Sequence, residues 1–268
     1  MRLPAAGLAL LLLAVAGCSS TTLNTSPPGG TPEVRPAKPS EPADPERRAK
    51  LRLELASAYF GRGQTQTALE EVTQAIAVKP DLPEAYTLLG LIQASQGDAK
   101  QAEDSFKRAL QIAPGNADTM HNYGWFLCQQ RRFPEADAQF QAILAQPRVR
   151  DTARTLLAAG VCQARAERWA DAEATLSRAF ELDPANPATA FNLSEVLYRR
   201  GDYERARFYI KRVNAVPDYT NAQTLWLAAR IERRIGNGGG VQEFARQLRD
   251  RFPQAPETAL LDQGRFDD

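Results

Sequence analysis

Apolar residues recur at helical spacing from Ala49 onward, and short polar breaks separate them at regular intervals. The string EEVTQAIAVKP at 70–80 returns 34 residues later as DSFKRALQIAP at 104–114, and again as ATLSRAFELDP at 174–184. A period of this length is typical of paired helices stacked in a row. The pattern therefore predicts an all-α array of helix pairs.

The order of small and large residues within each period resembles the tetratricopeptide pattern. Residues 83–116 show it most clearly, with Leu89-Gly90 in a first helix, then Ala102 and Phe106 in a second, and Pro114 at the exit. The resemblance implies a right-handed tetratricopeptide-repeat superhelix of about six helix pairs. The repeats are placed at 49–82, 83–116, 117–150, 153–186, 187–220 and 221–253, with two extra residues near 146–151.

Glycine and proline mark the expected ends of these helices. Gly63, Gly97 and Gly201 fall between the two helices of a pair, where a left-handed C-cap needs no Cβ. Pro80 and Pro184 follow second helices, because proline cannot continue the hydrogen-bond ladder. The folded domain is therefore expected to span 49–255, followed by a tail at 256–268.

The first residues predict export and lipidation. Residues 1–17 begin with Arg2 and contain a short apolar run at 8–15, which is typical of a signal peptide and too short to span a bilayer. The sequence before Cys18 resembles a bacterial lipobox, so Cys18 is the predicted acylated N-terminus. The alternative is an ordinary signal peptide with an incidental cysteine. Ser19, rather than Asp, favours the outer membrane, and the Pro-rich segment 18–48 is predicted to be a disordered linker.

Charge and chemistry exclude several classes of function. The chain has 33 Lys and Arg against 32 Asp and Glu, and loss of Arg2 with the signal would leave a neutral protein. A neutral chain gives no reason to expect nucleic-acid binding. The single histidine, His121, lies in no catalytic or metal-binding motif, and without further ligands at suitable spacing we expect no metal, no cofactor and no enzymatic activity.

Cys128 and Cys162 remain after lipidation and lie in the first helices of neighbouring repeats. Their repeat positions place them at similar heights on adjacent helices, so a disulfide is expected in the oxidising periplasm. Two buried free thiols are the alternative.

The inner positions of the first helices are the candidate partner-binding groove. Outward-facing apolar and aromatic side chains there suggest that a helix or an extended peptide is buried in the groove. The candidate residues are Leu53, Phe60, Leu91, His121, Trp125, Leu157, Phe191, Tyr198 and Leu225. Some of them could instead pack against the next repeat.

The segment HNYGWFLC at 121–128 goes beyond the generic repeat. Together with Cys18, Cys162 and the terminal Phe252-Pro253, it resembles the type IV pilus biogenesis and stability lipoproteins of the PilF/PilW family. The resemblance implies a pilotin-like lipoprotein that helps outer-membrane secretin subunits to localise and multimerise. We expect a monomer anchored by acyl chains on Cys18 and facing the periplasm. The alternative is a general periplasmic adaptor lipoprotein for outer-membrane protein assembly or peptidoglycan enzymes.

Overall fold

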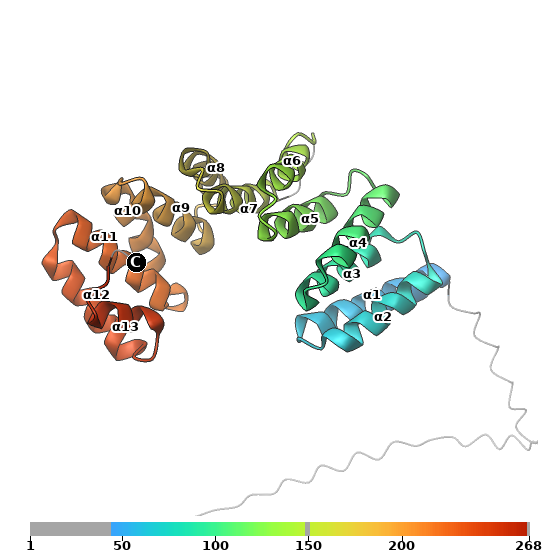
Figure 1. Cartoon of the computed structure of the whole chain (residues 1–268), viewed down its shortest axis with the longest axis horizontal. Coiled ribbons are helices and arrows are strands. Elements are labelled where there is room, and N and C mark those ends of the chain that lie inside the picture. Colours follow the sequence, from blue (N-terminus) through green and yellow to red (C-terminus); the bar gives the residue numbers. More distant parts are fainter. Residues whose placement is uncertain (1–43, 148–150, 267–268) are drawn as a thin grey trace, which may run out of the picture. The chain divides into compact units, whose positions relative to one another are not determined.

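Six helix pairs follow one another in the computed structural model, which describes residues 44–147 and 151–266 (Figure 1). The first helices are α1 (Pro45–Gly61), α3 (Pro83–Gln96), α5 (Ala117–Gln129), α7 (Thr152–Arg165), α9 (Pro187–Arg199) and α11 (Ala222–Ile235). The second helices are α2 (Thr65–Val78), α4 (Ala99–Ile112), α6 (Phe133–Leu144), α8 (Trp169–Leu182), α10 (Tyr203–Asn214) and α12 (Gly238–Arg251). A 3₁₀ turn, η1 (Pro217–Tyr219), precedes α11, and α13 (Pro256–Asp262) follows the last pair.

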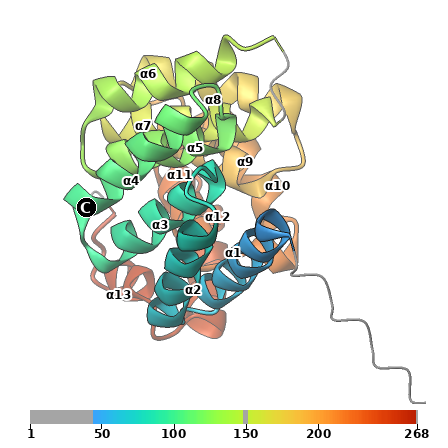
Figure 2. The same cartoon turned by 90° about the vertical axis from the view of Figure 1, so that its right-hand side faces the viewer.

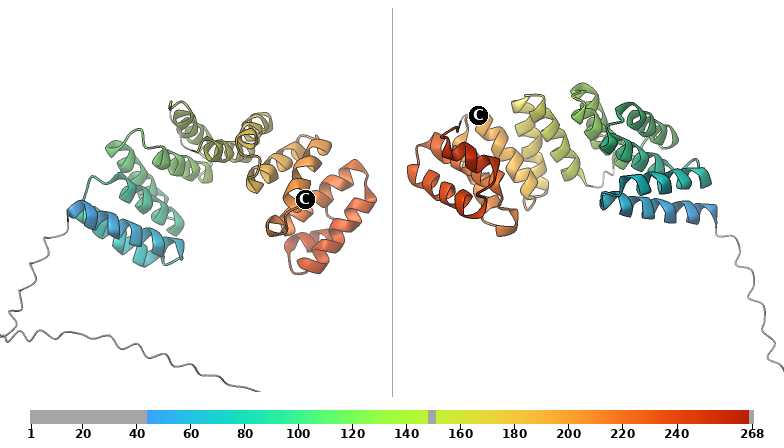
Figure 3. Two further views of the ribbon diagram at one scale, coloured as in Figure 1. Left: turned by 180° about the vertical axis from the view of Figure 1, so that it is seen from behind. Right: turned by 60° about the horizontal axis from the view of Figure 1, so that its bottom comes forward.

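Each second helix packs against its own first helix, and α2 to α10 also pack against the first helix of the next pair. Neighbouring first helices also contact one another from α1 to α11. Figures 2 and 3 show these consecutive pairs side by side from three further directions. The predicted all-helical array of six pairs is confirmed, and the described residues contain no strand.

Close packing within a pair depends on a small residue in the first helix. A Cβ on Gly124 would lie 3.0 Å from the ring of Phe140, and one on Gly160 would lie 2.6 Å from Leu176 Cγ. The distance at Gly160 is too short for any side chain, and the distance at Gly124 requires the Phe140 ring to shift, because protein interiors have little spare volume at such crossings. In the fifth pair the small residue is Ser194, whose Oγ donates to the Ala206 carbonyl at 2.8 Å.

The turns inside the pairs use left-handed backbone, as predicted at three glycines. Gly63, Gly97 and Gly201 have φ values of 74°, 87° and 83°. Arg131 and Glu167 occupy the corresponding place in the third and fourth pairs, with φ values of 61° and 60°. A side chain at such a position strains the backbone, so these two turns are less favourable locally than their glycine counterparts.

A recurring cap starts the later first helices. Asn116, Asn186 and Asn221 each accept a hydrogen bond from the backbone N–H of a threonine three residues on. These threonines, Thr119, Thr189 and Thr224, are buried, as is Thr155 in α7. The buried threonine therefore marks the same position in four successive first helices.

The folded region extends beyond the expected 49–255 at both ends. Asp44 accepts a hydrogen bond from the Glu46 N–H, and Pro45 opens α1, within the segment assigned to the linker. At the other end, α13 and Phe266 cover α11 and α12, with Leu261 and Phe266 buried. The predicted signal peptide, Cys18 and linker residues 18–43 lie outside the described residues.

Candidate partner-binding groove

Two rows of equivalent positions run along the first helices and form the candidate groove. The first row holds the fifth residue of each of the first five repeats and the sixth residue of the last, and the second row holds the residue one helical turn later. The first row is Leu53, Thr87, His121, Leu157, Phe191 and Trp226, and the second is Ser57, Leu91, Trp125, Val161, Glu195 and Arg230. Because residues four apart share one helix face, each helix presents one side chain from each row to the same side.

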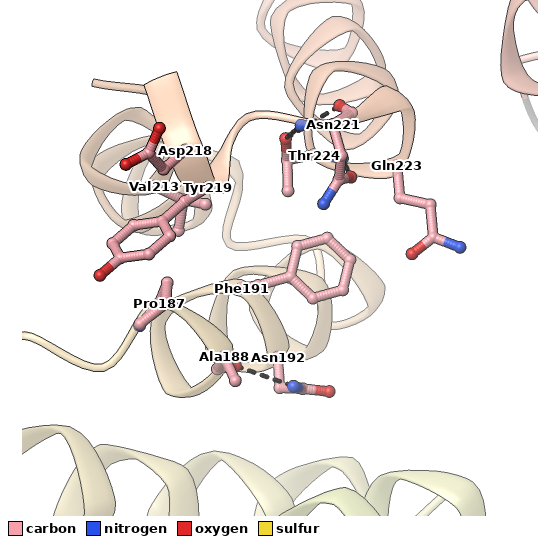
Figure 4. Close-up of a pocket in the computed structure, with 10 residues that line it drawn as sticks. All are labelled: Pro187, Ala188, Phe191, Asn192, Val213, Asp218, Tyr219, Asn221, Gln223 and Thr224. Carbon is pink, nitrogen blue, oxygen red and sulfur yellow. Dashed lines mark hydrogen bonds between the residues drawn. The ribbon is translucent and has the colours of Figure 1, made fainter. Parts of the chain in front are cut away.

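Three hollows lie along these rows. The N-terminal pocket, about 280 Å³, is lined by Leu53, Ser57, Glu84, Thr87, Leu88, Leu91, Asn116, Asp118 and Thr119. The central pocket, about 430 Å³, is lined by His121, Asn122, Trp125, Arg154, Leu157, Ala158, Val161 and Asn192. The C-terminal pocket, about 310 Å³, has Phe191 at its centre, Pro187 and Tyr219 on one side and Thr224 on another (Figure 4).

The central pocket brings three of the predicted groove residues together. His121 and Trp125 come from α5, Leu157 comes from α7, and all three side chains are partly exposed. The guanidinium of Arg165 lies 4.8 Å from the Trp125 ring centroid, which fixes the indole by a cation–π contact. Asn192 lines both this pocket and the C-terminal pocket, so the two hollows adjoin.

His121 is a neutral side chain at neutral pH. Its burial, reinforced by the positive charge of Arg154, lowers its pKa from 6.5 to about 4. The ring of Phe140 meets the imidazole nearly edge-on, with 6.0 Å between ring centroids. A neutral, half-buried imidazole suits the wall of a binding pocket that also holds apolar side chains.

Two of the predicted groove residues are core residues instead. Leu225 is 0 % exposed and packs with Trp226, Ala229 and Leu248. The prediction was one residue out of register, because η1 lengthens the fifth repeat by one residue and the buried Thr224 sets the register. The equivalent position belongs to Trp226, which is itself 6 % exposed and covered by Phe266, so the open groove ends before α11. Tyr198 is 6 % exposed, lying beneath the guanidinium of Arg230 at 4.7 Å.

The remaining predicted groove residues divide between pockets and packing. Leu53 and Leu91 line the N-terminal pocket, and Phe191 lines the C-terminal pocket. Phe60 lines none of the three hollows; it packs partly buried against the core of the first two pairs.

The structure brings Cys128 and Cys162 together on α5 and α7. Their Cα atoms are 5.7 Å apart, within the range that a disulfide requires, and the sulfur atoms are in contact. Both residues are buried at about 1 % exposure. A link at this point ties the first helices of the third and fourth pairs, which form the two walls of the central pocket.

Ion pairs between repeats hold the scaffold behind the groove. Glu103 of α4 receives hydrogen bonds from Arg132 at 2.7 Å and from the Tyr123 hydroxyl at 3.0 Å. Arg132 first, then Lys107 and Tyr123, lower the pKa of Glu103 to about 2. Asp137 pairs with Arg168, and Glu173 pairs with Arg200. Each of the three arginine links joins a second helix to the turn of the next pair, so together they fix the spacing between repeats.

Metal-ligating side chains do not converge in the part of the chain that the structure describes. No group of three or more His, Cys, Asp or Glu side chains in 44–147 and 151–266 is placed to hold a metal ion. Among the described helices, none combines the length and the apolar character needed to cross a bilayer. The arrangement provides hollows for apolar side chains and polar groups between them, which suits binding of a protein segment.

Comparison with known proteins decides the family. Tetratricopeptide repeat models match residues 53–117, 93–160 and 163–225, together more than half of the chain. The chain belongs to the tetratricopeptide repeat family. It is 24 % identical over 257 residues to the type IV pilus assembly protein PilF of Pseudomonas aeruginosa, covering 96 % of this chain and 97 % of that protein.

Solved structures agree with this assignment. The crystal structure of PilW, a type IV pilus biogenesis factor, matches with a TM-score of 0.75 and 27 % identity over 80 % of this chain and 97 % of PilW. The structure of Pseudomonas aeruginosa PilF matches with a TM-score of 0.70 and 21 % identity over 82 % of this chain and 99 % of that chain. The tetratricopeptide superhelix and the homology to PilF and PilW, both predicted from the sequence, are confirmed.

Proposed function

We propose that this chain is a non-enzymatic scaffold lipoprotein of type IV pilus biogenesis. In this proposal it works as a pilotin and promotes the outer-membrane localisation and multimerisation of secretin subunits. The observation that carries the proposal is the similarity to PilF over 96 % of the chain, together with the similarity to PilW. The row of hollows along the first helices supports a protein partner, because each hollow can take one apolar side chain.

The central and N-terminal pockets are the proposed secretin-binding site. Trp125 is partly exposed, rigidly held and surrounded by Leu157 and His121, which are features of an interface anchor. Leu91 provides the equivalent apolar surface in the N-terminal pocket. A secretin segment with apolar side chains at matching spacing buries them in these two hollows.

Substitution of the pocket residues tests this proposal. Trp125→Ala combined with Leu91→Ala is expected to reduce secretin multimers and surface pili, at normal protein level and helix content. Leu51→Ala is the matched control, because Leu51 is 55 % exposed on α1 and lines none of the hollows. Unchanged multimers and piliation in the double variant would rule out the groove. Lost pili together with defective assembly of unrelated outer-membrane proteins would favour the general adaptor.

Lipidation of Cys18 is the proposed anchor, with the folded repeats facing the periplasm. Acyl chains hold a protein at a membrane through the burial of their methylene groups, and one chain alone binds only marginally. Cys18→Ala is therefore expected to release the protein into the soluble fraction and to leave secretin subunits unassembled. The anchor would be contradicted if Cys18→Ala stayed in the outer membrane and the parent protein carried no acyl label at residue 18.

We also propose that Cys128 and Cys162 form a disulfide in the exported protein. Their separation and burial support it, as does the oxidising environment of the periplasm. The bridge closes a loop between residues 34 apart and contributes about 2–4 kcal/mol in the chain-entropy account. A thiol reagent added to denatured mature protein is expected to label neither cysteine; two labelled thiols would exclude the bridge.

A further inference from the structure

Exposed apolar side chains are concentrated in the sequence of the fourth and fifth pairs. The described residues contain six exposed large hydrophobic side chains, and four of them lie between residues 182 and 219. They are Leu182 at 59 %, Phe208 at 55 %, Val216 at 38 % and Tyr219 at 43 % exposure. Single exposed hydrophobic residues are ordinary, whereas a local concentration of them marks an interaction surface.

A fourth hollow, of about 500 Å³, has two of these side chains, Val216 and Tyr219, in its lining. It is lined by Pro184, Ala185, Asn186, Pro187, Ala190, Arg212, Val213, Ala215, Val216 and Tyr219. It shares Pro187, Val213 and Tyr219 with the C-terminal pocket, so it adjoins the C-terminal end of the groove. Figure 4 shows Tyr219 beside Pro187 at this boundary. We name Phe180, Phe208, Arg212, Val216 and Tyr219, with this hollow, the edge surface.

Arg212 gives the edge surface a specific charge. Its guanidinium lies 5.6 Å from the ring centroid of Phe180 and 5.8 Å from that of Phe208. None of the ion pairs between described residues involves Arg212, Lys211 or Arg178. Asp218 faces the C-terminal pocket and does not line the hollow beside Arg212. A guanidinium held against aromatic rings keeps its N–H edge available for a carboxylate.

We propose that the edge surface is a second docking site and that it binds an acidic segment of another protein. An aliphatic or aromatic side chain of that segment enters the 500 Å³ hollow, and a neighbouring Asp or Glu pairs with Arg212. Apolar lining and an unpaired cation at one rim complement this combination and disfavour a basic segment. The proposal does not rest on the function proposed for the groove.

Peptide binding to the purified full-length protein tests the edge surface. The probes are three fluorescein-labelled hexapeptides: GEFDEG, which has both features, GKFKKG, which reverses the charge, and GEADEG, which lacks the aromatic ring. Fluorescence anisotropy is expected to show saturable binding of GEFDEG alone. The affinity should fall as salt is raised, because the carboxylates contribute to binding.

Three variants locate the binding. Arg212→Gln is expected to weaken GEFDEG binding about tenfold or more, because it removes a charged hydrogen bond. Val216→Asp should have a similar effect, because it places a charge in an apolar hollow. Arg212→Glu should shift the preference to GKFKKG. Arg108→Gln is the matched control, because Arg108 also lies over a ring, 5.7 Å from the Tyr86 centroid, away from the edge surface. Trp125→Ala should leave the binding of GEFDEG unchanged.

Other outcomes would overturn the proposal. GEFDEG that does not bind, or that binds Arg212→Gln as tightly as the wild type, would contradict it. Binding that Trp125→Ala weakens as much as Arg212→Gln does would place the peptide in the groove. Vesicles with anionic phospholipid that bind the wild type but not Arg212→Gln, while GEFDEG does not bind, would assign the surface to a membrane. A dimer that Val216→Asp dissociates would assign it to a second copy of the chain.

Discussion

At the scale of single residues, the central pocket depends on a histidine whose burial keeps it uncharged. The pKa of His121 is lowered from 6.5 to about 4, first by burial and then by Arg154. A histidine with a depressed pKa stays neutral in the native state while the unfolded chain takes up a proton. The native state therefore loses stability as pH falls from about 6.5 toward 4.

This effect predicts a measurable pH dependence. The urea midpoint of the wild type is expected to fall between pH 7.5 and pH 5.5, a range above the usual titration of carboxylates. His121→Gln should show a flatter profile over the same range, because the variant removes the only histidine. A profile of unchanged slope in His121→Gln would show that another group takes up the proton.

Single residues also show how far the sequence could predict the groove. Six of the nine predicted groove residues line the three hollows, and helical spacing alone was enough to assign them to one face. They are Leu53, Leu91, His121, Trp125, Leu157 and Phe191. The prediction of Leu225 as a groove residue was wrong because a fixed 34-residue period cannot detect the residue added at η1. The Asn-x-x-Thr cap at Asn221 was the signal that could have corrected the register to Trp226. The edge surface depends on how side chains from separate helices meet, which periodicity does not reveal.

At the scale of helices, the crossing of α7 and α8 has no room for a side chain. Gly160→Ala would place its Cβ 2.6 Å from Leu176 Cγ, on the branch point of a side chain that is fully buried. We expect a loss of about 1–3 kcal/mol in unfolding free energy, because overpacking forces the helices apart. Gly61→Ala is the control, because no neighbouring atom lies within 4 Å of its added Cβ. Equal stability of the two variants in urea would show that the crossing can relax.

In the turn between α7 and α8, a substitution is expected to stabilise the protein. Glu167 has a φ of 60°, at the place where other pairs use Gly97 and Gly201. Glu167→Gly is expected to raise the unfolding free energy by about 0.5–1 kcal/mol, since relief of the left-handed strain exceeds the added freedom of the unfolded chain. Differential scanning calorimetry measures the change. Arg165→Gly, within the helix, should instead destabilise, and a loss in both variants would show that Glu167 is not strained.

At the scale of the whole molecule, stability comes from contacts between neighbouring pairs, so the ends need their own cover. Pro45 and the segment 256–268 were assigned outside the repeat domain, because prolines and an unmatched tail carry no repeat signal. Pro45 and residues 256–266 belong to folded ends: Asp44 and Pro45 start α1, and α13 covers α11. The period thus predicted the interior of the array and not its termini, where the pattern ends but apolar surface still has to be buried.

The C-terminal cover leads to a prediction about where the molecule opens first. The Phe266 ring lies 5.0 Å from Trp226, beneath the guanidinium of Arg233 at 4.4 Å, and its carbonyl accepts from Arg230 Nε at 2.8 Å. Phe266→Ala removes this buried ring, and such a change typically costs about 3–5 kcal/mol of stability. A short terminal helix is not stable without its packing contacts, so it cannot compensate for this loss. We expect α13 to detach and Trp226 to become accessible to iodide quenching.

Amide hydrogen exchange separates this local opening from global unfolding. Protection in Phe266→Ala should fall in α11, α12 and α13 and stay at the wild-type level in α1 to α4, because each pair contacts only its neighbours. Phe208→Ala is the control, a phenylalanine of α10 that is 55 % exposed, and it should leave protection unchanged throughout. Equal loss of protection in α1 to α4 would mean that the array unfolds as one cooperative unit, so that its two ends are coupled through all six pairs.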